Sequence, residues 1–320
     1  MRSMGFRSEF LLGALDDEML LGVLFDVAVV VLALTALAAF AIVGLERIKE
    51  FRHRAVDRFR LVFPYLLLLG GVLFINDLLR DIGPQISWIF GWRITSDIIA
   101  LEGTLVADLQ QYAHPWLTYY FSYIYIYGYI FLLVFPIVAY FVYTDDRPVK
   151  EAALAYTLNY GIGVVCYMVF VAFGPRNAGP EFGEALLYTH WPESQLLTSE
   201  VNANVNVFPS LHTSLAATVA ILAYRWRDIY WSWLPLATLL AISVAISTMY
   251  LGIHWATDVV AGVVLALVSV GLAIWLTRPK RQDGPLGRAG HRLRRVVDIP
   301  VDYTIAQLQG LYAKRWGDSQ

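Results

Sequence analysis

The chain has 320 residues, of which 58% are hydrophobic and 16% are charged, and its mean hydropathy is +0.55. This composition excludes an ordinary water-soluble domain and indicates a membrane protein. The formal net charge of -2 and the pI near 6.3 argue against nucleic acid as a partner, because binding to a duplex needs a basic face that displaces counterions. The one cysteine, Cys166, allows no intrachain disulfide.

Residues 1–26 form a predicted external N-terminal segment. Its first part, Met1 to Glu18, ends in three acidic residues and lacks the basic, apolar and small-residue pattern of a cleavable signal peptide. Beyond it, seven stretches approach the roughly 20 mainly apolar residues that a spanning helix needs. These stretches are residues 27–45, 59–76, 117–143, 152–174, 207–224, 231–253 and 255–277.

No repeat, low-complexity tract or flexible linker divides these seven stretches. The sequence therefore predicts an all-α fold, with one polytopic membrane helix bundle over residues 27–277 and a basic tail over residues 278–320. The connection 77–116 is amphipathic enough to lie on the bilayer surface. The tail segment 300–316 places apolar residues on one face beside two basic residues, which favours a helix on the anionic inner leaflet, and a packed or disordered tail fits equally well.

The distribution of Lys and Arg predicts how the bundle is oriented. Nineteen of the 24 basic residues lie in alternate connections and in the tail, and cytoplasmic loops are the ones enriched in Lys and Arg. The tail is therefore predicted to be cytoplasmic and the N-terminus external. The remaining basic residues fall in the other set of segments and are Arg2, Arg7, Arg80, Arg93 and Arg176.

Four ionisable residues share the external side in this arrangement, namely His212, His254, Asp258 and Arg176. His254 and Asp258 are spaced i, i+4, which predicts that they meet on one face of a helix. Each residue alone has a plainer interpretation, as an interfacial side chain or as an acid at a helix start. Together they indicate a site, because ionisable groups at a membrane boundary usually face a cavity or one another.

Two imidazoles, a carboxylate and an arginine suit phosphoryl transfer. His254 can attack phosphorus if Asp258 fixes its tautomer and stabilises the imidazolium that develops. His212 can protonate the departing oxygen. Arg176, in "FGPRNAGP", is the candidate partner of the phosphate oxygens, since positioning and electrostatics carry most of the catalysis in this reaction class.

The stretch "NVFPSLHTS" predicts a helix start that can bind phosphate. Pro209 lacks the N–H that would be unpaired there, so that Ser210, Leu211 and His212 would present free backbone N–H groups from the first turn. Helix starts of this kind bind phosphate well. The Ser210 hydroxyl either adds a donor to the phosphate or serves only as an N-cap.

"FPSLHTS", followed later by "YLGIHWATDVVAG", resembles the last two motifs of the type 2 phosphatidic acid phosphatase superfamily, over roughly residues 117–277. The resemblance implies a core of six membrane helices, with the first span here as an addition. It also implies that His254 is the nucleophile and Asp258 its partner. His212 would be the general acid and Ser210 a phosphate contact, in a reaction that uses no metal and no cofactor.

Three departures from the superfamily pattern narrow this resemblance. Val169 stands where a Lys is expected, Thr248 where an Arg is expected, and Leu211 where Gly is usual. Loss of two cations with retention of both His and the Asp is similar to the inositol phosphorylceramide synthase branch, which moves a phosphorylated head group from one lipid to another alcohol. The sequence therefore predicts an inositolphosphotransferase-type enzyme with a lipid substrate in the bilayer and a small alcohol as acceptor. The alternative is a lipid phosphate phosphatase, of the phosphatidate or polyprenyl diphosphate type, with water as acceptor.

Two interpretations from other classes stay open. Two His and a carboxylate could ligate zinc or iron, although the neighbouring arginine favours phosphate. The polar residues could instead mark the pathway of a transporter. Transporters are expected to have broken helices and charges near the midplane, however, and these residues cluster at one edge.

Overall fold

The structure of the protein is a computed structural model that describes residues 2–192, 194–195 and 207–278, without the side chains of residues 2–18 and 80–84. The predicted tail lies outside the described residues except for its first position, and the tail segment 300–316 lies wholly outside them. The described chain is almost entirely helical, with one pair of two-residue strands. The predicted all-α class is therefore confirmed.

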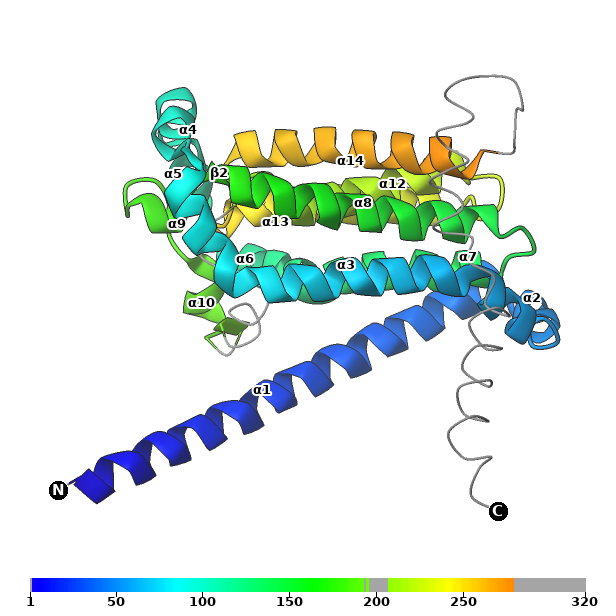
Figure 1. Ribbon diagram of the computed structural model, residues 1–320, viewed down its shortest axis with the longest axis horizontal. Coiled ribbons are helices and arrows are strands. Elements are labelled where there is room, and N and C mark those ends of the chain that lie inside the picture. The colour runs from blue at the N-terminus through cyan, green and yellow to red at the C-terminus, as the bar shows by residue number, and fades with distance from the viewer. Residues whose placement is uncertain (1, 193, 196–206, 279–320) are drawn as a thin grey trace, which may run out of the picture.

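Six helices in the described part of the chain are long and apolar enough to cross a membrane. They are Met19–Val43, Ala55–Leu79, Pro115–Val142, Arg147–Val169, Trp233–Tyr250 and Ala256–Thr277. The remaining predicted span appears as α12 (Leu211–Arg225), whose 15 residues rise only about 22 Å, less than the ~30 Å of a hydrocarbon core. Figure 1 shows α12 inside the bundle, where it packs against α8, α13 and α14, so that its neighbours shield it from lipid.

The first helix stands apart from the others. Helix α1 (Arg2–Ala38) continues through a π-helical segment, η1 (Ala39–Val43), and Figure 1 shows it leaving the bundle at an angle. Val27 and Val31 pack against the bundle, whereas most of the large apolar side chains of α1 from Met19 onward are exposed. This arrangement fits an additional span beside a six-helix core. The predicted boundary at residue 26 falls inside α1, which has no break there.

The predicted surface connection 77–116 is wrong over its first part. After the short helix α2 (Leu45–Phe51), helix α3 runs from Ala55 to Phe90, because apolar residues recur until Gly91 ends the helix. The rest of the connection contains β1 (Trp92–Arg93), α4 (Thr95–Glu102) and α5 (Leu105–Gln110). Figure 1 shows α4 and α5 covering one end of the bundle.

The third span is one helix built from three pieces. They are α6 (Pro115–Tyr123), the π-helical segment η2 (Ile124–Gly128) and α7 (Tyr129–Val142). A π-helical turn inserted in an α-helix often marks a functional site. Here η2 lies midway along the span and contributes Tyr125 to the surroundings of His212.

Helix α8 (Arg147–Val169) leads into β2 (Phe170–Val171), which pairs in parallel with β1. Two short helices follow, α9 (Pro175–Ala178) and α10 (Leu186–His190), and both lie at the same end of the bundle as α4 in Figure 1. Helices α13 (Trp233–Tyr250) and α14 (Ala256–Thr277) complete the described chain. The turn between them also faces this end.

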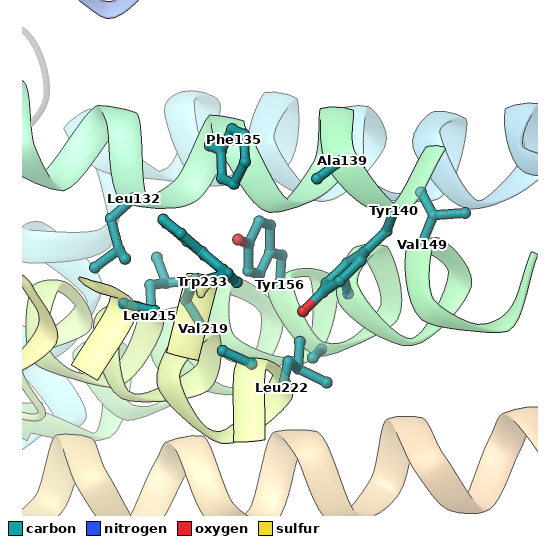
Figure 2. Packing of buried hydrophobic residues seen from close by; sticks show 14 of the residues in the cluster. Leu132, Phe135, Ala139, Tyr140, Val149, Tyr156, Leu215, Val219, Leu222 and Trp233 are labelled. Carbon is teal, nitrogen blue, oxygen red and sulfur yellow. The ribbon is translucent and has the colours of Figure 1, made fainter. Parts of the chain in front are cut away.

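The main apolar core lies between α7, α8, α12 and α13. Figure 2 shows Trp233 between side chains of α7 and α12, and its ring centroid is 4.6 Å from that of Phe135. Trp233 is almost fully buried, which is favourable for a ring of this size. The core therefore fixes α12 against its neighbours and so fixes the position of its first turn.

An ion pair between a buried glutamate and an arginine at the surface closes the opposite end of the bundle. The Glu151 carboxylate accepts two hydrogen bonds from Arg225, at 2.7 and 3.0 Å, and one from the indole N–H of Trp226 at 2.9 Å. The three residues join the start of α8 to the end of α12. A buried carboxylate needs such partners, because an unpaired charge in this position would be costly.

Candidate active site

The turn between α13 and α14 places His254 against Asp258. His254 Nδ1 lies 3.3 Å from Asp258 Oδ2, and the two residues are 2% and 0% exposed. The predicted contact is present, but its predicted geometry is wrong, because His254 precedes the helix. Trp255 is the extended N-cap residue, and Asp258 is the third helical residue, whose carboxylate also accepts the Trp255 backbone N–H at 2.9 Å.

Backbone contacts from α13 and α9 fix this turn. The N–H groups of Ile253 and His254 both donate to the Thr248 carbonyl at 3.0 Å, and the Arg176 N–H donates to the Gly252 carbonyl at 3.1 Å. Gly252 has φ +72°, and a Cβ there would clash with the Glu184 carbonyl. Glycine therefore meets both the backbone conformation and the close approach at this position.

The start of α12 lies beside the start of α14. Ser210 is the N-cap of α12, and its own N–H donates to the Asp258 carbonyl at 3.0 Å. Its hydroxyl accepts the Thr213 N–H and donates to the Thr213 hydroxyl at 3.1 Å. The structure thus places Ser210 in the N-cap role, and the predicted free N–H of Ser210 is wrong. Pro209 precedes the N-cap instead of standing in the first turn.

Leu211 is the first helical residue of α12, and its side chain is buried. It packs against Gly163 of α8, where any Cβ would collide with it. Leu211 could therefore contact a phosphate through its backbone only. The small residue at position 163 allows α8 and α12 to approach closely at the level of the site.

His212 faces His254 across the site, with ring centroids 6.4 Å apart. Two tyrosine rings pack on its imidazole. Tyr125 is stacked at 4.6 Å with an interplanar angle of 22°, and Tyr129 lies at 4.4 Å and is tilted by 39°. The ring plane of His212 is therefore set by aromatic contacts from the third span.

Arg176 lies in α9, next to the turn that carries His254. Its guanidinium carbon is 4.7 Å above the centre of the Tyr188 ring, which is a cation–π distance. Its Nη1 is buried and has no hydrogen-bond partner in the described part of the chain. A buried cationic donor without a partner is unfavourable, so this atom is well suited to an anionic ligand.

The positions that depart from the superfamily pattern supply no positive charge. Val169 ends α8 and is 47% exposed. Thr248 is fully buried, and its hydroxyl donates to the Ala245 carbonyl of its own helix at 2.8 Å. Arg176 therefore has no second cation beside it at either of these positions.

Several residues at the site were missed by sequence reasoning. Tyr125 and Tyr129 belong to the tyrosine-rich run "YYFSYIYIYGY", which was a visible signal with no assigned role. Tyr167 of α8 donates its hydroxyl to the Pro209 carbonyl at 3.2 Å, and Glu102 of α4 binds the first turn of α14. Neither of the last two has a signal in its local sequence.

A metal site would need several His, Cys, Asp or Glu side chains close together. Across residues 2–192, 194–195 and 207–278, no three His, Cys, Asp or Glu side chains are grouped so that they could hold a metal ion. The arrangement offers instead a histidine paired with a carboxylate, a second histidine across from it, and an arginine. These are the groups expected for nucleophilic and general acid–base chemistry.

Comparison with protein families identifies the class. A family profile described as the PAP2 superfamily matches residues 98–272, which is more than half of the chain. The chain therefore belongs to the PAP2 superfamily, as the two histidine motifs predict. Together with its six candidate spans, this match makes it an integral, multi-pass membrane protein.

One curated relative is similar to part of the chain. The chain is similar to the bacitracin transport permease protein BcrC of Bacillus licheniformis, with 34% identity over 88 residues. The similar region covers 27% of this chain and 39% of the relative, so that the chain spans about two fifths of the relative's length. No solved structure matches the chain.

Proposed function

We propose that the chain is a membrane phosphotransferase that moves a phosphorylated head group, of the inositol-phosphate type, from a lipid to an alcohol through a phosphohistidine at His254. The observation that supports this most is the contact between His254 Nδ1 and Asp258 Oδ2. It occupies one ring nitrogen and leaves Nε2 as the nitrogen with a free lone pair. Asp258 then also stabilises the positive charge that develops on the ring.

The first half-reaction attaches the head group to the enzyme. His254 Nε2 attacks phosphorus, an N–P bond forms, and the P–O bond to the lipid alcohol breaks. The leaving oxygen takes a proton from the His212 imidazolium, which becomes neutral. Asp258 keeps the proton on His254 Nδ1 throughout and does not itself exchange it.

The second half-reaction reverses these roles with a different alcohol. Neutral His212 accepts the proton of the acceptor hydroxyl as its oxygen attacks phosphorus. An O–P bond forms, the N–P bond breaks, and His254 returns to its starting state. One histidine thus serves as the nucleophile and the other as the acid and then the base, which is consistent with their positions on opposite sides of the site.

The charge of the site favours a phosphodiester donor. Arg176 supplies one positive charge, and the uncharged Val169 and Thr248 stand where the superfamily pattern expects cations. A phosphodiester carries one negative charge, whereas a phosphate monoester carries close to two at neutral pH. The single charge of the Arg176 guanidinium matches that of a phosphodiester better than that of a monoester. Its buried Nη1 can donate to a phosphate oxygen.

A competition between acceptors tests this proposal. Membranes from cells with and without the chain are incubated with a labelled inositol phospholipid and with labelled phosphatidate, in the presence of free inositol or another alcohol, and the products are separated. The proposal expects the labelled head group to appear on an alcohol acceptor. Water as the acceptor would release inositol phosphate from the inositol phospholipid and free phosphate from phosphatidate. Free phosphate from phosphatidate as the main product would support the lipid phosphatase instead.

The name of the Bacillus licheniformis relative, a bacitracin transport permease protein, raises transport as a second candidate function. A transporter would move its substrate without forming a covalent intermediate. Uptake or efflux by proteoliposomes that persists in a His254→Gln protein would favour transport. Loss of all activity together with the phosphoenzyme would favour the transferase.

We also infer the orientation and the division of the chain from the distribution of Lys and Arg. The active site and the N-terminal residues 1–26 face the extracytoplasmic side, residues 27–277 form the catalytic bundle, and the basic tail 278–320 is cytoplasmic. A Cys166→Ser protein with one new cysteine allows a test by impermeant thiol labelling of intact cells. Cysteine at Pro180 should be labelled and cysteine at Arg52 should not, and the opposite pattern would reverse the orientation.

A further inference from the structure

Glu102 binds the start of the helix that carries Asp258. It is the last residue of α4, and its Oε2 accepts the Ala256 backbone N–H at 2.9 Å. Its Oε1 accepts the Thr257 backbone N–H. Both oxygens of one carboxylate therefore bind the first two helical residues of α14.

This contact completes the first turn of α14. The first N–H groups of a helix have no partner within it, and carboxylates are favourable there because of the helix dipole. Asp258 accepts the N–H of Trp255, and Glu102 accepts those of Ala256 and Thr257. One carboxylate comes from α14 itself, and the other comes from a segment more than 150 residues earlier in the chain.

Helix α4 is itself anchored to the site. The Phe173 N–H donates to the Thr95 hydroxyl at 3.1 Å, and the Phe173 carbonyl accepts the Trp255 indole N–H at 2.8 Å. Ile98 of α4 belongs to the buried cluster that includes Trp255. Glu102 is thus held by a packed element, and it can transmit that rigidity to the turn that carries His254.

We propose that Glu102 is a positioning residue, which fixes the first turn of α14 so that Asp258 holds His254 with Nε2 directed at phosphorus. The inference rests on the proposed function. It deepens that function, because the connection between the second and third spans becomes part of the catalytic geometry. Glu102 does not touch the reacting atoms and acts through Asp258.

The test compares Glu102→Ala and Glu102→Gln with wild type in the full-length purified protein. The measurements are kcat, KM for an inositol phospholipid, the rate of phosphoenzyme formation in a single turnover, and the melting temperature. We expect Glu102→Ala to lower kcat and the phosphoenzyme rate about tenfold or more with little change in KM, because a small misplacement of a reacting group is costly. The kcat and the phosphoenzyme rate of Glu102→Gln should lie between those of wild type and Glu102→Ala, since its amide oxygen can still accept one N–H. Asp97→Asn, an exposed carboxylate on the same helix, is the control and should equal wild type.

A second variant approaches the same contact from the other side. Ala256→Pro removes one of the two N–H donors without touching Glu102, and proline is well tolerated at the first helical position. As a single substitution, Ala256→Pro should lower the rate of phosphoenzyme formation. In the Glu102→Ala background it should cause little further loss of that rate, because both changes break the same contact. Fully additive losses would overturn the inference.

The other outcomes are also decisive. Wild-type rates in Glu102→Ala, or a raised KM with unchanged kcat, would overturn the positioning role. A lowered melting temperature with a normal phosphoenzyme rate in the folded fraction would reduce Glu102 to a structural cap and would overturn it too. If wild type itself forms no phosphoenzyme, the proposed function fails first, and the two failures are thereby distinguished.

Discussion

The two halves of the site are held in different ways. The turn that carries His254 is fixed by hydrogen bonds from α13, α9 and α4, and its histidine is paired with a buried carboxylate. His212 instead lies in the first turn of α12, and its ring packs on two tyrosines, of which Tyr125 is stacked and Tyr129 is tilted. One half is a polar network, and the other is an aromatic contact.

This difference corresponds to what each histidine would have to do. A nucleophile needs one fixed tautomer and one fixed direction, which hydrogen bonds specify closely. A general acid that becomes a base must exchange a proton in each half-reaction, so that a permanent partner on its ring would hinder it. Aromatic stacking fixes the ring plane of His212 and leaves its nitrogens to the substrate.

The largest effect is expected at the centre of the polar half. His254→Gln should abolish both the phosphoenzyme and turnover, because no neighbouring side chain can replace an attacking nitrogen. His190→Gln is the matched control, since His190 lies at the same end of the bundle and pairs with no carboxylate in the described part of the chain. Residual phosphoenzyme in the His254→Gln protein would place the nucleophile elsewhere.

Asp258→Asn should leave the nucleophile present but poorly held. We expect kcat to fall on the order of a hundredfold or more, by analogy with the carboxylate of a catalytic triad. Single-turnover kinetics should assign this loss to phosphoenzyme formation. A fall of only a few-fold would mean that the contact between His254 and Asp258 is structural.

His212→Gln should affect substrates differently according to how much their leaving group needs a proton. With the natural lipid we expect a loss of about a hundredfold, which is typical of a missing general acid. An aryl phosphate has a leaving group that needs little protonation, so it should form the phosphoenzyme at a rate much closer to wild type. Equal losses with both substrates would contradict the role of His212 as a proton donor.

The smallest effect is expected at the aromatic contact. Tyr125→Leu removes one stacked ring and should lower turnover of the natural lipid by about tenfold or less, because the His212 ring becomes less well oriented. Tyr125→Phe keeps the ring and should remain near wild type. If Tyr125→Phe is as impaired as Tyr125→Leu, the hydroxyl matters and the stacking account is wrong.

Much of the fold could be predicted from the sequence, because hydropathy reports directly on membrane spans. The main difference is at the end of α3, where the sequence predicts a surface segment from residue 77 and the helix continues to Phe90. The contact between His254 and Asp258 was predicted from helical spacing, yet it forms through an N-cap. Both geometries bring His254 and Asp258 together, and their spacing in the sequence does not distinguish one geometry from the other.

The supporting residues could not be predicted in the same way. Glu102 reaches the backbone of the first turn of α14 because α4 folds over the end of the bundle, and no local pattern encodes that distant contact. Tyr125 reaches His212 from a π-helical segment, whose extra residue per turn changes the direction of its side chains relative to an ordinary helix. Tertiary packing therefore determines the positions of both Glu102 and Tyr125.

The most direct test of the central claim is the location of the phosphoryl group on the enzyme. Wild-type protein is incubated with a labelled phospholipid, quenched at high pH and digested, and the modified peptide is identified by mass spectrometry, with phosphorus NMR to distinguish the ring nitrogens. The account predicts modification of His254 at Nε2, since Asp258 occupies the Nδ1 side. Modification of His212, or of His254 at Nδ1, would contradict it.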